Sequence, residues 1–139
     1  MELLNEVRGL DSQGAGYYHA PRGNRLHNGV DLITAPNNSI LAHTPGYVTK
    51  IGYPYNPTDK RGRGILRYVQ ITDLAGFLWR YFYVLPTVKK GAFVFIGKKI
   101  GIAQDLNGFY PRITPHIHLE IKNGTSGVFI NPNKLLMLE

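Results

Sequence analysis

Short runs of β-branched and aromatic residues, separated by Gly, Pro, Asn and Asp, recur along the chain from Val30 onward. This pattern is typical of antiparallel β proteins, because such residues favour strands and the separators favour turns. It predicts a mainly β fold, either a single antiparallel β-sheet or a β-sandwich-like arrangement. The expected strands are 30–33, 40–42, 46–53, 65–72, 77–85, 98–102 and 117–122, and Asn133 to Leu138 is expected to form a short C-terminal helix.

Two connections between the expected strands are long, namely 54–64 and 104–115. Long loops in compact domains are often functional, and the second one leads directly into His116, so we expect them to form the walls of a groove. Glycines at four positions predict a loop-rich lead-in over residues 1–26, ahead of a core over 27–139. The length and the lack of repeats predict one domain, 1–139.

The amino-acid composition restricts which residues can bind a metal and which partners the protein attracts. There is no cysteine, so disulfides and thiolate metal sites are excluded, and any metal must be bound by His, Asp or Glu. The 16 Lys and Arg against 9 Asp and Glu give a net charge of +7, which favours a polyanionic partner: nucleic acid, anionic cell-wall polymers or acidic lipid. The basic residues form short clusters without a recognition helix, which argues against specific nucleic-acid binding.

The ends of the chain and its apolar runs bear on localisation. The first residues are acidic where a signal peptide carries positive charge, so no signal peptide is expected. No run approaches the ~20 apolar residues of a transmembrane helix. The sequence therefore predicts a soluble protein without a membrane span.

The segment His116-Ile117-His118-Leu119-Glu120 alternates polar and apolar residues. Side chains alternate across a strand, so His116, His118 and Glu120 share a face that cannot be the apolar core. Both imidazoles can then point into one cleft, where one binds a metal and the other lies beside it. Taken alone, the segment also fits an exposed polar strand with two incidental histidines.

A second group lies near the N-terminus, where His27 and Asp31 are four residues apart in a turn that enters a strand. The Asp31 carboxylate would help to hold a dication. Combined with His118, these residues supply a three-ligand zinc site with an open fourth position, as hydrolytic zinc sites have. Each histidine also needs a partner for its second ring nitrogen, which the sequence does not identify.

The order and spacing of these motifs resemble the lysostaphin and LytM type zinc endopeptidases. The similarity covers roughly residues 11–136, and it rests on Arg22, 27–32, 42–48, 90–91, 99–101 and 115–120. It implies a small antiparallel β scaffold with a groove, and hydrolysis of peptide bonds in bacterial cell-wall peptidoglycan. By position, it implies that His27, Asp31 and His118 bind Zn²⁺, and that His116 is catalytic, assisting the water or the developing oxyanion.

The chain departs from the family at one position. The family has a second catalytic His in a Tyr-x-His-Leu-like stretch, which corresponds here to Trp79 to Pro86, and the expected position is Leu85. This departure makes the chain most similar to a leukocyte chemotaxin-like subgroup. His19 or Tyr83 could replace the missing group, although Tyr83 also fits a packed strand aromatic. His43 is expected to be structural, and a supporting role for Glu120 is favoured over one as base.

Three functional hypotheses follow. The first is a zinc metallopeptidase that cuts peptidoglycan peptides, with a phage origin, as an endolysin or a virion-associated enzyme, fitting a short basic domain without a signal. The second is a catalytically impaired zinc-binding module that binds cell wall or a protein partner. The third is a structural component of a phage particle.

Overall fold

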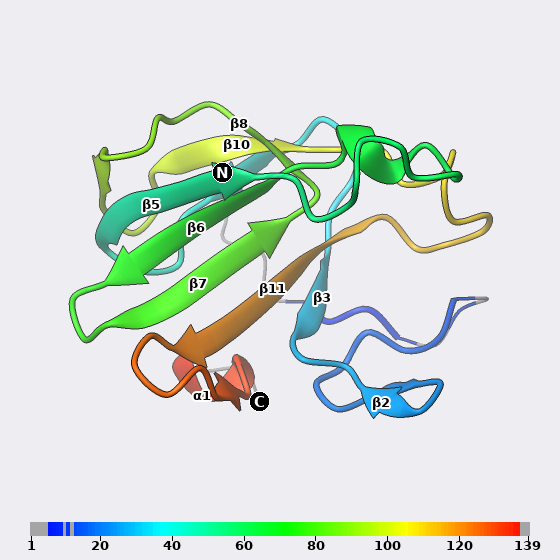
Figure 1. Cartoon of the computed structure of the whole chain (residues 1–139), viewed down its shortest axis with the longest axis horizontal. Helices are drawn as coiled ribbons and strands as arrows, with labels where there is room; N and C mark the ends of the chain where they lie inside the picture. Colours follow the sequence, from blue (N-terminus) through cyan, green and yellow to red (C-terminus); the bar gives the residue numbers. More distant parts are fainter. Residues whose placement is uncertain (1–5, 10, 12, 137–139) are drawn as a thin grey trace.

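The computed structural model describes residues 6–9, 11 and 13–136, and it confirms the mainly β fold. Seven strands form a large antiparallel sheet in the order β12-β11-β7-β6-β5-β9, with β3 paired to β11 (Figure 1). Their bounds are β3 (Val30–Ile33), β5 (Gly46–Gly52), β6 (Tyr68–Asp73), β7 (Phe77–Phe82), β9 (Phe93–Val94), β11 (His116–Asn123) and β12 (Phe129–Ile130).

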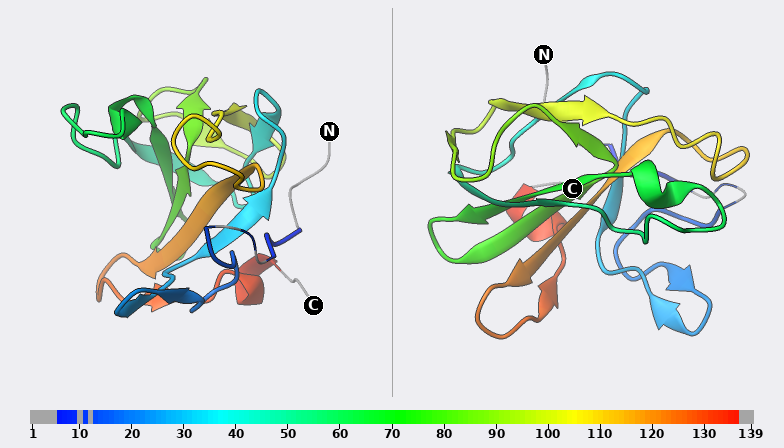
Figure 2. Two further views of the ribbon diagram at one scale, coloured as in Figure 1. Left: turned by 90° about the vertical axis from the view of Figure 1, so that its right-hand side faces the viewer. Right: turned by 45° about the horizontal axis from the view of Figure 1, so that its top comes forward.

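A smaller sheet of three strands packs against the large one (Figure 2). It is ordered β4 (Ser39–Leu41), β10 (Lys99–Ala103) and β8 (Val84–Pro86), while β1 (Pro21–Arg22) and β2 (Arg25–Leu26) form a separate hairpin. Side chains from the seven-stranded and the three-stranded sheet form one buried apolar cluster between them, which explains the sandwich-like arrangement. Its members include Val30, Leu32, Ile40, Val48, Val69, Ile71, Trp79, Tyr81, Ile100, Ile117, Leu119 and Ile121.

Most expected strands are found within one or two residues of their predicted bounds, but two differ. The strand expected from residue 65 begins at Tyr68, because Arg63–Ile65 forms a 3₁₀ helix. The strand expected over 77–85 is two strands, β7 and β8, which belong to different sheets. Tyr83 separates them with a φ of 69°, a left-handed conformation that interrupts a strand.

Four strands were not predicted, namely β1, β2, β9 and β12, and each has only two residues. A two-residue strand shows no alternation over the 4–8 residues that a sequence pattern needs. The C-terminal helix is present as α1 (Asn133–Leu136), and the last two residues predicted for it lie outside the described residues. No helix within the described ranges is long and apolar enough to cross a membrane.

The alternation of β11 sets the position of the polar residues. Ile117, Leu119 and Ile121 enter the core, and the intervening side chains of this strand face away from it. Both long loops and the hairpin β1–β2 lie at the same end of the sheet, around the start of β11 (Figure 1). The loops therefore surround the polar face of β11 where it begins.

Candidate metal centre and active site

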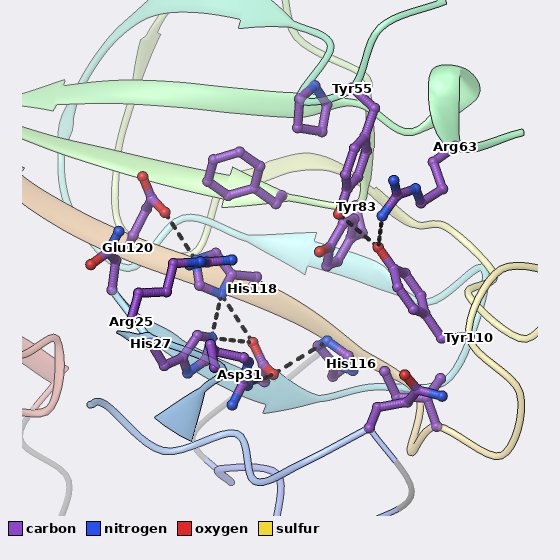
Figure 3. Close-up of a pocket in the computed structure, with 16 residues that line it drawn as sticks. Arg25, His27, Asp31, Tyr55, Arg63, Tyr83, Tyr110, His116, His118 and Glu120 are labelled. Carbon is purple, nitrogen blue, oxygen red and sulfur yellow. Dashed lines mark hydrogen bonds and ion pairs between the residues drawn. The ribbon is translucent and has the colours of Figure 1, made fainter. Parts of the chain in front are cut away.

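Strands β3 and β11 bring the three expected metal ligands together. Asp31 on β3 is the direct antiparallel partner of His118 on β11, and His27 lies in the turn between β2 and β3. His118 Nδ1 is 3.0 Å from both His27 Nε2 and Asp31 Oδ1, and the latter two atoms are 3.2 Å apart (Figure 3). Two ligand atoms on one tetrahedral zinc ion are roughly 3.4 Å apart, so this donor set fits the metal.

The second ring nitrogen of each histidine ligand has a partner. His27 Nδ1 donates to the backbone carbonyl of Tyr17 at 2.9 Å, which leaves Nε2 as the ligand atom. His118 Nε2 donates to Glu120 Oε1 at 3.0 Å, which leaves Nδ1 as the ligand atom. Such partners fix the tautomer and the orientation of metal-binding histidines. Glu120 is therefore placed for the supporting role that the sequence favoured.

Charge is balanced within the site. Burial by itself raises the pKa of Asp31, but hydrogen bonds from His118 and His27 hold that pKa well below its usual value. Burial by itself lowers the pKa of His118, but hydrogen bonds to Asp31 and Glu120 raise that pKa to about 9. The two carboxylates therefore favour a positive charge at this point, as a bound cation requires.

His116 lies beside the three ligands and is buried. Its Nδ1 donates to the backbone carbonyl of Thr114 at 2.8 Å, and its Nε2 is 3.5 Å from Asp31 Oδ2. Burial lowers the pKa of His116, so the ring is neutral near pH 7 and Nε2 carries a free lone pair. The structure thus brings together all four residues that the sequence singled out for the site.

Tyr83, and not Leu85, lines the pocket beside His116. The Tyr83 ring meets the His116 ring edge-on, with centroids 5.8 Å apart. Leu85 lies on β8, is 42% exposed, and lines a different hollow with Ile65 and Ile102. The expectation that Leu85 occupies the place of a catalytic group is therefore wrong. The left-handed backbone at Tyr83 ends β7 and turns the chain into β8, which carries Leu85 away from the site.

The two long loops form a wall of the pocket, as the sequence predicted. The hydroxyl of Tyr55, from the first loop, forms a 2.6 Å hydrogen bond with the hydroxyl of Tyr110, from the second. Arg63 donates to the Tyr110 hydroxyl at 3.3 Å (Figure 3). Arg63 also lies over the Tyr55 ring, 4.1 Å from its centroid. The pocket holds about 450 Å³ and is lined by Gln13, Arg22, Arg25, His27, Asn28, Asp31, Pro54, Tyr55, Arg63, Phe82, Tyr83, Tyr110, Ile113, His116, His118 and Glu120.

The two remaining histidines lie elsewhere. His43 is bound to the buried Tyr81 hydroxyl through its backbone N–H and its Nδ1, which confirms a structural role. His19 stacks on Tyr18 and does not line the pocket, so it is not the substitute considered from the sequence. Tyr83 is the one of the two proposed substitutes that does line it.

One functional residue escaped the sequence analysis. Arg8 is only 2% exposed, and its Nε and Nη2 donate to Asp31 Oδ2 at 3.1 and 3.0 Å. A buried arginine is rare unless it is paired, so this contact marks Arg8 as part of the site. An arginine in a glycine-rich lead-in carries no sequence pattern that separates it from surface arginines.

Comparisons with known proteins agree with this geometry. The model of Peptidase family M23 matches residues 25–132. Leukocyte cell-derived chemotaxin-2 from Bos taurus is 34% identical over 116 residues, which cover 84% of this chain and 73% of that protein. The corresponding protein from Mus musculus is 33% identical over the same shares of the two chains.

Solved structures show the same fold. The catalytic domain of the antimicrobial peptidase lysostaphin from Staphylococcus simulans gives a TM-score of 0.67 at 23% identity, covering 89% of this chain and 90% of that one. The catalytic domain of a prophage-encoded M23 protein from Enterococcus faecalis gives a TM-score of 0.61 at 19% identity, covering 94% and 88%. The family model spans well over half of the described residues, so the chain belongs to the M23 peptidase family.

Proposed function

We propose that this protein is a zinc metallopeptidase that hydrolyses peptide bonds in bacterial peptidoglycan. The observation that carries the proposal is the convergence of His27 Nε2, Asp31 Oδ1 and His118 Nδ1 in one pocket, with His116 beside them. Membership of the M23 family and the lysostaphin-like fold support the same conclusion. The three ligands leave one side open to the pocket, where a peptide can enter.

Zinc held by His27, Asp31 and His118 would supply Lewis-acid chemistry and a water of lowered pKa. The neutral His116 ring presents Nε2, which can accept a proton as a new bond forms and return it to the departing amine. Burial raises the pKa of the Tyr83 hydroxyl well above its usual value, so this group stays protonated. It can therefore donate a hydrogen bond to a developing oxyanion beside His116.

Three arginines line the pocket wall, but Arg63 is paired with Asp59 and Arg22 lies 3.8 Å from Asp31. Arg25 is therefore the arginine that favours a carboxylate on the substrate. The net charge of +7 adds a general attraction to anionic wall polymers around the substrate. The proposed site of action is therefore the cell wall. A place in a phage particle is a separate proposal, and it would be tested by finding the chain in purified particles.

The experiment is digestion of purified walls with zinc-loaded protein, followed by quantification of newly formed amino termini. Wild-type protein should release peptide, and EDTA or His118→Ala should abolish the release. His19→Ala is the matched control, because it removes a histidine that does not line the pocket. Equal release by wild type and His118→Ala would refute the enzyme proposal.

The second candidate is a zinc-dependent binding module without turnover. Two observations favour it: a tyrosine, Tyr83, and not a second histidine stands beside His116, and two relatives are named chemotaxins. It predicts wall binding that EDTA removes, with no new amino termini. Tyr83→Phe separates the two candidates, because it should lower turnover on the order of 10²-fold in the enzyme and leave binding unchanged in the module.

A further inference from the structure

The segment that precedes the family match closes one side of the site. We call the described residues from Glu6 to Gly16 the N-terminal clasp; none of them lies in the matched range 25–132. Arg8 N–H donates to the Asp31 carbonyl at 2.7 Å, and Asp31 N–H donates to the Gly16 carbonyl at 2.7 Å. A Cβ on Gly16 would lie 2.6 Å from Arg8 Cβ and 2.9 Å from Asp31 Cβ. The clasp therefore packs directly on the backbone of a metal ligand.

The Arg8 side chain divides the two oxygens of Asp31 between two tasks. Its Nε and Nη2 both donate to Oδ2, at 3.1 and 3.0 Å, whereas Oδ1 faces His27 and His118. A planar guanidinium holds a carboxylate in one orientation better than a lysine ammonium does. The two hydrogen bonds from Arg8 to Oδ2 thus keep Oδ1 of Asp31 pointed at the proposed metal position.

Nη1, the third nitrogen of the Arg8 guanidinium, links the N-terminal clasp to His116 through Asp11 and Thr114. Arg8 Nη1 is 2.7 Å from Asp11 Oδ1, and Asp11 Oδ2 accepts the backbone N–H of Thr114 at 2.8 Å. The Thr114 carbonyl in turn accepts Nδ1–H of His116 at 2.8 Å. One chain of contacts therefore reaches from the Asp31 carboxylate to the His116 ring.

We propose that Arg8 and Asp11 are positioning residues, Arg8 for the metal ligand Asp31 and Asp11 for the tautomer and orientation of His116. This inference rests on the proposed zinc-dependent function and deepens it. The N-terminal clasp is then an integral part of the site, although it lies outside the region by which the family is recognised.

Zinc affinity, measured by competition with a chromogenic chelator, tests the Arg8 branch without any turnover. Arg8→Gln should weaken zinc binding by about 10–100-fold, the usual range for residues that orient a metal ligand. Arg8→Lys retains the positive charge but not the two parallel N–H donors, so it should give an intermediate loss of zinc affinity. Arg61→Gln is the matched control, because it removes an exposed arginine that does not line the pocket, and it should stay within about threefold of wild type.

Each measurement is made on protein that circular dichroism shows to be folded. Arg8→Lys decides the test if Arg8→Gln fails to fold. Zinc affinities of the folded Arg8 variants within twofold of wild type would overturn the Arg8 branch, and so would an equal loss in Arg61→Gln. Failure of the wild-type protein to bind zinc would instead refute the proposed function.

The Asp11 branch is tested by ¹⁵N NMR of the His116 ring in metal-free protein. Wild type should show the tautomer with the proton on Nδ1, and Asp11→Asn should show a mixture of tautomers. In the active enzyme the same variant should lower kcat several-fold with little change in KM and in zinc affinity. A wild-type ring spectrum in Asp11→Asn would overturn this branch, whether or not the wild-type protein has turnover.

Discussion

The folded structure stabilises the ionised form of the Asp11 carboxylate, and the size of this stabilisation can be predicted. It accepts the backbone N–H groups of Gln13 and Thr114 and pairs with Arg8. Burial by itself raises the pKa of Asp11, but these hydrogen bonds and the Arg8 charge lower the pKa from 3.8 to about 2. At 1.36 kcal/mol per pKa unit, ionised Asp11 contributes about 2 kcal/mol to the free energy of unfolding.

The sign of this contribution fixes its pH dependence. Because the pKa is lower in the folded state, the stabilisation is fully present above pH 4 and is lost as the pH falls through 2. Metal-free Asp11→Asn should therefore be less stable than wild type by about 2 kcal/mol at pH 6, and the difference should shrink below pH 4.

Urea unfolding followed by circular dichroism in EDTA, from pH 2 to pH 7, measures this difference. Asp105→Asn is the control for loss of one negative charge, because Asp105 is exposed and accepts only the neighbouring Asn107 N–H among the interactions described for it. A stability difference for Asp11→Asn that stays constant from pH 2 to pH 7 would refute the assignment, because it would show that the ionised carboxylate is not the stabilising group.

Three further predictions test the geometry of the site. Glu120→Gln should weaken zinc binding about 10–100-fold in chelator competition, because an amide is a poorer acceptor for His118 Nε2–H; unchanged affinity would contradict the supporting role. Gly29→Ala should lower stability by about 1–3 kcal/mol in thermal unfolding, because its Cβ would lie 2.2 Å from the Leu119 carbonyl oxygen, and a wild-type melting temperature would contradict the close approach of these backbones. Leu85→His should not raise wall hydrolysis, since Leu85 lines another hollow; a tenfold gain would place it at the reaction centre after all.

The sequence predicts most of the fold because the long strands alternate clearly. In β11, Ile117, Leu119 and Ile121 enter the core and the residues between them do not, as the period of two requires. The same pattern cannot detect the break at Tyr83. The run from Phe77 to Leu85 remains rich in strand-forming residues, and only the backbone conformation at Tyr83 divides it between two sheets.

The proposed metal ligands and the contacts around them differ in how far the sequence could predict them. His27, Asp31 and His118 stand in short motifs whose residue types, taken together, favour metal binding. Their supporting partners include a backbone carbonyl, that of Tyr17, and Arg8, which is 23 residues from Asp31. Backbone carbonyls leave no mark in a sequence, and a single arginine gains its meaning only from burial.

Metal binding and catalytic activity depend on contacts from different parts of the chain. The three proposed ligands contact Arg8, Tyr17 and Glu120, and none of these direct contacts involves a residue of the two long loops. The groups that would assist the reaction depend on those loops and on the end of β7: His116 is oriented by Thr114, and Tyr83 packs beside it. A change at Thr114, in the second loop, can therefore alter turnover while the direct contacts of the proposed metal ligands stay in place. Zinc binding and turnover are therefore separate properties of this fold, and the formation of new amino termini measures turnover directly.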